Sequence, residues 1–369
     1  MSQRNNSWKR NLGALVCVFA LGVGAPAASS GQTRNGPDVD PAAVTFHKDI
    51  EPILQRSCQN CHREESVAPM SLLTYADARP WARAMKRRTA MGPRAGVMPP
   101  WYVERNIGIQ DYKYDPSLSD TEVALIATWA DNGAPRGNPA DAPPARDFGD
   151  GGWTIGAPDL ITVLPEIIVG GDQPDWWGEI ETTPVGNTAD RYVEALEFHE
   201  VNDVLDTEDS RETVGGRFVF HHMIWSTQVV DDDSEQDVTR SRDTTTGWPV
   251  HEVGRNADTF DPRAGRLLAA NSSVVSNSVH LHSNGRDTKA HLEIAWKFHP
   301  EGYEPELKRA RRGLGDGLNI DIRPEEAGQE LHAYTVLQQH QKLTTFEPHL
   351  HAPGQRMCLE AIWGNHIET

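Results

Sequence analysis

The chain has 369 residues, and its 53 acidic side chains outnumber its 35 lysines and arginines to give a net charge of −18. An acidic surface of this kind argues against nucleic acid or anionic lipid as a partner. The length allows two or three domains, each with a hydrophobic core of its own.

The N-terminus predicts an export signal. Basic residues precede an apolar run, and small residues follow it: Arg4, Lys9, Arg10, Leu12–Val23 and Ala25–Ala27. These are the three parts of a signal peptide, so we assign residues 1–27 to one and expect a periplasmic or secreted protein. Its removal would change the net charge from −18 to −21, because it carries three basic residues and no acidic one. No apolar stretch reaches spanning length, so we expect no membrane span.

The segment Cys58-Gln59-Asn60-Cys61-His62 predicts covalent attachment of haem c. Two thiols one helical turn apart can add to the two haem vinyl groups, and the adjoining His62 can ligate the iron. A redox dithiol or half of a zinc site are the alternatives. They are less favoured because the chain has no second CxxC and no βαβ pattern around this one.

Helix signals surround this motif. Apolar residues share a helical face just before it, at Ile50, Ile53 and Leu54. Thr74 with Asp77 begins a second predicted helix, and Ser119 with Glu122 forms a capping box before a third. The arrangement resembles the class I cytochrome c fold, and we expect an all-α cytochrome c domain over residues 44–135.

The resemblance requires a second axial ligand, for which Met98 is our choice. Met98-Pro99-Pro100-Trp101 contains two prolines that stiffen the loop. A Met/His pair would raise the haem potential and suit electron transfer. Other methionines remain alternatives, namely Met70, Met85 and Met91, and Met98 itself could be a core residue.

Residues 136–152 are rich in Pro, Ala, Asp and Gly, which predicts a linker. Short alternating segments with Gly, Pro and Asn turns follow, and the clearest predicted strands are 217–225 and 291–296. An all-β sandwich or jelly roll is the class expected there. An acidic run at Asp231–Asp233 lacks a recognisable calcium loop and is interpreted as a solvated turn.

Histidine is the second strong signal, since thirteen of the fifteen lie between His199 and His366. Three groups stand out: His221-His222, His280-Leu281-His282 and His349-Leu350-His351. Residues two apart in a strand face the same side, so each H-x-H can offer two imidazoles to one ion. Adjacent His221 and His222 would share an ion only where the strand bulges or ends. Imidazoles without thiolates suit copper or zinc.

Single histidines in a β domain are more often structural than metal-ligating. We interpret six of them as structural: His199, His251, His299, His332, His340 and His366. Two histidines are weak reserve candidates for a metal ligand, namely His291 and His299. Cys17 belongs to the predicted signal peptide and two cysteines to the haem motif. Only Cys358 then remains, so no intrachain disulfide is expected.

A His-His-Met on a strand, a later V-H-x-H and then a P-H-x-H resemble the copper type II monooxygenases. That family includes peptidylglycine α-hydroxylating monooxygenase and dopamine β-monooxygenase. The resemblance implies two consecutive jelly rolls, each holding one copper. It matches His221, His222 and His282 to a three-histidine copper that passes electrons. His349 and His351 match a second copper, with two histidines and a methionine, that activates oxygen. His280 has no counterpart.

The resemblance covers residues 153–369, which it divides into a first jelly roll at 153–317 and a second at 318–369. About fifty residues are too few for a whole domain, so we expect this second jelly roll to be incomplete. The chain lacks the disulfides of the animal enzymes, and no convincing methionine ligand follows His351. Met357 is interpreted as a strand or core residue, and the thioether ligand is expected beyond Thr369.

These observations predict a haem- and copper-dependent oxidoreductase. The haem would pass electrons from a redox partner or ascorbate to the first copper, and the second would activate oxygen and hydroxylate an organic substrate. Two alternatives remain. One is a non-catalytic electron-transfer or copper-binding protein, and the other is a metal-free β module that retains an enzyme's shape.

Overall fold

The computed structural model describes residues 43–63, 66–105, 107–109, 112–148, 152–204, 214–229, 245–309, 311, 313–314, 321–350 and 354–369. Three features predicted from the sequence lie outside the described residues: the signal peptide at 1–27, the acidic turn at Asp231–Asp233, and His351.

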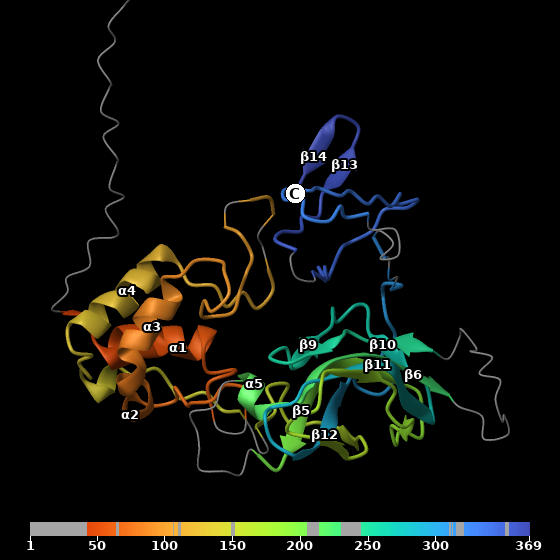
Figure 1. Ribbon diagram of the computed structural model, residues 1–369, viewed down its shortest axis with the longest axis horizontal. Coiled ribbons are helices and arrows are strands. Elements are labelled where there is room, and N and C mark those ends of the chain that lie inside the picture. Colours follow the sequence, from red (N-terminus) through yellow and green to blue (C-terminus); the bar gives the residue numbers. More distant parts are fainter. Residues whose placement is uncertain are drawn as a thin grey trace, which may run out of the picture. The chain divides into compact units, whose positions relative to one another are not determined.

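The helices of the described chain are short, and most of them precede residue 142 (Figure 1). A π-helical turn at Phe46–Ile50 leads into α1 (Glu51–Ser57), and the others are α2 (Tyr75–Ala78), α3 (Ala82–Thr89), α4 (Asp120–Asp131) and α5 (Val214–Arg217). Single 3-10 turns lie at Arg79–Trp81 and Pro139–Asp141.

Side-chain caps explain where two of these helices begin. The Ser119 hydroxyl accepts the backbone N–H of Glu122, and the Glu122 carboxylate accepts the N–H of Ser119. Thr74 and Asp77 form the same reciprocal pair at α2. Each pair satisfies two backbone donors that a helix N-terminus leaves unpaired, so both predicted capping boxes are confirmed.

The expected fold class is wrong for the first part of the chain. The described residues form mainly β-sheet, and the short helices at 43–148 do not make an all-α cytochrome c domain. No helix lies among the described residues between the end of α3 at Thr89 and the start of α4 at Asp120. That segment contains Gly92, Pro93, Gly96, Pro99 and Pro100, and such residues interrupt helices.

Two antiparallel six-stranded sheets make up the β region. The first contains β1 (Leu160–Val163), β2 (Ile167–Val169), β5 (Arg191–Asn202), β9 (Ala257–Thr259), β10 (Arg266–Leu268) and β12 (Thr288–Phe298). The second contains β3 (Trp176–Gly178), β4 (Thr183–Pro184), β6 (Phe220–Val229), β7 (Thr246–Gly247), β8 (His251–Glu252) and β11 (Ser272–Leu281).

Both sheets contribute to one hydrophobic core, as expected for a β-sandwich. Leu196 and Trp296 come from the first sheet, and Met223 and Trp225 from the second. Trp296 is fully buried, and its indole N–H donates to the Thr162 hydroxyl, so this polar atom remains satisfied inside the core. The core therefore packs β6 and β11, which carry His221, His222 and His280, against the first sheet.

The second, incomplete jelly roll is not seen among the described residues after 321. They form one hairpin, β13 (Ala361–Trp363) with β14 (His366–Glu368), and otherwise lack regular structure. Nearly all of their side chains are exposed, so this segment has no hydrophobic core on which a second sandwich could form. None of the described helices has the length and apolar character needed to cross a bilayer.

Candidate metal centre

A β-bulge places both adjacent histidines on the same side of β6. In the pairing of β6 with β11, His222 is opposite His280 and Phe220 is opposite Leu281, so the register skips His221. An extra residue in one strand rotates the side chains that follow it, which lets neighbours share a face. The Nδ1 atoms of His221 and His222 lie 3.1 Å apart. The bulge that a shared ion requires is therefore present.

Three imidazoles converge at this bulge. One ring nitrogen from each of His221, His280 and His282 lies within 4.8 Å of the others, a spacing that allows one metal ion between them. Both nitrogens of His280 and Nε2 of His282 are buried without a hydrogen-bond partner. Unpaired buried polar atoms are costly, and a metal ion would satisfy one nitrogen of each ring.

Within this histidine cluster (His221, His222, His280 and His282), the electrostatics favour the neutral form of three rings, those of His221, His222 and His280. Burial lowers the pKa of His221 and of His280, and the neighbouring imidazoles lower both further. Burial, followed by His280 and His221, lowers the pKa of His222 to about 4. A neutral imidazole is the form that binds a metal ion, so these three rings are in the metal-binding form at neutral pH.

The ligand set expected from the sequence differs from the set that the geometry favours. His221, His222 and His282 were expected, with His280 left unassigned. The converging nitrogens belong instead to His221, His280 and His282. His222 lies beside them, with its ring centroid 4.9 Å from that of His280. Strand alternation had grouped His280 with His282 on one face, and only the family resemblance left His280 unassigned.

Strand β3 completes the surroundings of the cluster. The ring of Trp177 stacks on His280 with centroids 3.8 Å apart, and it meets the His222 ring in a T-shaped contact with centroids 4.6 Å apart. Asp175, just before β3, faces two rings: its carboxylate oxygens are 3.4 Å from His280 Nε2 and 3.5 Å from His282 Nδ1. Sequence reasoning missed both residues, because only the pairing of β3 with β11 brings them here.

Glu200 is a third residue that the sequence did not reveal. It extends from β5 in the first sheet and accepts the backbone N–H groups of Val219 and Phe220, at the start of β6 in the second. The Asn202 side chain donates to it as well, at 2.7 Å. Burial raises the pKa of Glu200 to about 7, although these donors oppose the shift. Glu200 therefore fixes the backbone immediately before His221.

The predicted haem-attachment motif forms a turn at the end of α1. The N–H of Cys61 and that of His62 both donate to the carbonyl of Cys58. Nδ1 of His62 lies 3.2 Å from the Met70 carbonyl, which can only accept, so Nδ1 carries the proton and Nε2 keeps a lone pair. That tautomer suits an axial histidine, whose orientation is fixed by the hydrogen bond of its other nitrogen.

The two thiols of this motif are free and half-buried. Burial, with a smaller contribution from Cys61, raises the pKa of Cys58 to about 12, so its sulfur stays protonated at neutral pH. A reactive dithiol requires a lowered pKa, so this environment disfavours the redox alternative. Free thiols beside an imidazole with an available Nε2 fit the haem c attachment.

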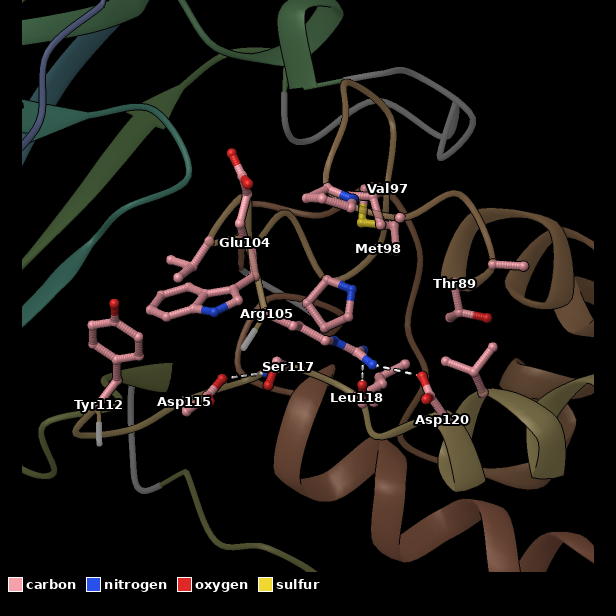
Figure 2. A pocket seen from close by; sticks show the side chains of 17 residues that line it. Thr89, Val97, Met98, Glu104, Arg105, Tyr112, Asp115, Ser117, Leu118 and Asp120 are labelled. Atoms are coloured by element: carbon pink, nitrogen blue, oxygen red, sulfur yellow. Dashed lines mark hydrogen bonds and ion pairs between the residues drawn. The ribbon is translucent and has the colours of Figure 1, made fainter. Parts of the chain in front are cut away.

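Met98 lies on the wall of a separate cavity of about 490 Å³ (Figure 2). Val97, Trp101 and Leu118 also line it, and Met98 is 40% exposed. Arg105 reaches across one side and donates to the carboxylate of Asp120. The cavity has the size of a cofactor pocket, but none of the attachment residues lines it. The structure therefore does not join Met98 to His62.

Most of the remaining histidines have structural contacts. His199 stacks on Trp153 with ring centroids 3.6 Å apart, and His299 stacks on Tyr303 at 3.8 Å. His349 is exposed in the segment without regular structure, and its expected partner His351 lies outside the described residues. The second predicted copper site therefore stays a prediction.

No known protein family, curated protein or solved structure matches the chain.

Proposed function

We propose that this protein is a haem- and copper-dependent oxidoreductase whose copper is held by the histidine cluster. The convergence of His221, His280 and His282 at the β6 bulge carries the proposal. Their donor set contains imidazole nitrogen and no thiolate, which suits copper or zinc. The CxxCH motif on the same chain favours copper, because haem c and copper both exchange single electrons.

The chain's own residues would hold both groups. Cys58 and Cys61 would form the thioethers, and Nε2 of His62 would ligate the haem iron. Met98 is proposed as the other ligand, which requires its loop to move from the cavity wall toward His62. The imidazoles of the histidine cluster would bind copper, and Trp177 would keep His280 in place by stacking. Copper in such a site supplies one-electron transfer and, in monooxygenases, oxygen activation.

The complete reaction that we propose is hydroxylation of a small organic substrate by oxygen, with electrons from a redox partner or ascorbate. It requires the second copper at His349 and His351. The alternative is a periplasmic electron-transfer or copper-binding protein. The cluster also supports this alternative, because its three converging imidazoles could hold one copper for electron transfer without the second copper.

The first test is the copper content per haem of the full chain, exported from a host that matures haem c. We expect one tightly bound copper per haem from the histidine cluster alone, and two if His349 and His351 also bind. His221→Ala should lose the cluster copper. The matched control is His332→Ala, since this histidine is exposed like His221, is paired with Glu330, and is outside the cluster. Equal copper loss in both variants, or the absence of bound copper in the wild type, would exclude the proposed centre.

A second pair of variants separates the two possible ligand sets. If the ligands are His221, His280 and His282, His280→Ala should weaken copper binding by about 100-fold or more. His222→Ala should then weaken it by only about tenfold, which is the range for a residue that supports a ligand without binding the metal itself. The reverse order would favour the ligand set implied by the resemblance. Rapid reoxidation of the reduced copper by oxygen would then favour the oxygenase, whereas slow reoxidation would favour the carrier.

A further inference from the structure

We propose that Asp175 is a fourth ligand of the metal centre and that it makes the centre selective for divalent metal ions. The inference rests on the proposed function, since it requires the histidine cluster to bind a metal. Asp175 directly precedes β3, whose Trp176 pairs with Leu281. Continuing this antiparallel register by one residue places Asp175 opposite His282. The carboxylate is therefore positioned by the sheet and does not depend on a free loop.

The distances fit coordination better than hydrogen bonding. The separations of 3.4 and 3.5 Å from Asp175 to His280 Nε2 and His282 Nδ1 exceed those of good N–H···O bonds, which are about 2.7–3.2 Å. Two ligands of a tetrahedral ion with bonds of about 2.1 Å lie about 3.4 Å apart, because the tetrahedron edge is about 1.63 bond lengths. Each of the two separations is thus the one expected between two ligands of the same ion.

The alternative is that Asp175 forms an ordinary surface ion pair, since its side chain is 57% exposed. The burial of His280 argues against this interpretation. Its side chain is only 10% exposed, and both of its ring nitrogens lack a hydrogen-bond partner despite the nearby carboxylate. Trp177 covers one face of the ring, so the ring cannot easily turn toward water. A metal ion between the carboxylate and the imidazoles satisfies both partners at once.

A carboxylate ligand changes which metals the centre prefers. Three imidazoles alone suit both oxidation states of copper, whereas an anionic oxygen ligand favours harder ions such as Cu(II) and Zn(II) over Cu(I). Asp175 would therefore stabilise oxidised copper and lower the reduction potential of the site. This property is expected of a centre that donates electrons onward.

The test compares Asp175→Asn with Asp172→Asn, a matched change three residues earlier, in the full haem-loaded chain. We expect Asp175→Asn to weaken Cu(II) and Zn(II) binding by about 100-fold or more in chelator competition, which exceeds the loss for a residue that only supports a ligand, with Cu(I) affinity nearly unchanged. Its Cu(II) paramagnetic resonance spectrum should shift, its copper potential should rise, and Asp175→Glu should recover part of the affinity. Asp172→Asn should behave as the wild type.

Two outcomes would overturn the inference, and they are distinguishable. If the wild type binds copper and Asp175→Asn binds Cu(II) equally well with an unchanged spectrum, Asp175 is no ligand, although the histidine centre stands. If the wild type binds neither copper nor zinc, the proposed function fails and the fourth ligand fails with it. Circular dichroism of each variant reports whether the β-sandwich has folded.

Discussion

The β-sandwich and the helical region position their candidate ligands by different means. In the sandwich, β3, β6 and β11 are neighbours in one hydrogen-bonded sheet, and their register brings together residues more than one hundred positions apart. In the helical region, one turn holds Cys58, Cys61 and His62, but Met98 lies in a segment without a helix. Ligands on paired strands are positioned by the backbone hydrogen bonds of the sheet, whereas ligands in loops depend on local packing.

The largest expected effect tests whether the two regions bind their groups independently. Replacing both Cys58 and Cys61 with alanine should abolish covalent haem, because no thiol remains at the motif to form a thioether. Copper binding by the histidine cluster should persist. Absorbance and the mass of the denatured protein measure the attached haem, and chelator competition measures copper.

Cys358→Ala is the control for that double variant, since Cys358 is exposed and far along the chain. It should keep all of its haem. Covalent haem in the double variant would refute the attachment site. Loss of copper together with haem would show that the two regions are coupled.

The second prediction concerns Glu200, the buried link between the two sheets. Its pKa rises from 4.5 to about 7 on folding, so the folded state favours the protonated carboxyl. Its contribution to stability is therefore complete below pH 4.5 and is lost as the pH rises through 7. A shift of this size corresponds to at most about 3 kcal/mol of unfolding free energy.

Glu200→Gln removes the titration and keeps the side-chain size. The difference in unfolding free energy between wild type and variant should change by up to about 3 kcal/mol between pH 4.5 and 8, with the wild type losing stability as the pH rises. Chemical denaturation at several pH values measures it, and all other titrating groups are common to both proteins. A difference that does not vary with pH would contradict the raised pKa.

Local signals in the sequence predicted part of the molecule well. The capping boxes at Ser119 and Thr74 involve residues only three positions apart, so the chain itself specifies them. The strand expected at 291–296 lies within β12, whereas the strand expected at 217–225 begins later, at Phe220. Arg217 ends α5 instead. Strand boundaries depend on pairing partners, which a single sequence does not show.

The candidate site was predictable only in part for the same reason. Alternation in a strand grouped His280 with His282, and the adjacent His221 and His222 required a bulge. Asp175 and Glu200 reach the site through other strands, so no spacing in the sequence connects them to it. The expected all-α domain failed because two good helix starts do not specify the long segment between them, where Gly and Pro prevent a helix.

The smallest expected effect concerns the helical region and tests how far its local signals stabilise it. Ser119→Ala removes the hydroxyl that accepts the Glu122 N–H at 3.2 Å, and we expect α4 to lose about 1 kcal/mol. Native-state hydrogen exchange of the amides in α4 measures this loss locally, without assuming that the whole chain unfolds in one step. Ser119→Asp should retain the cap, because its carboxylate can accept the same N–H. Unchanged exchange in Ser119→Ala would mean that packing, and not the cap, holds the helix start, so that this region too would depend on tertiary contacts as the sandwich does.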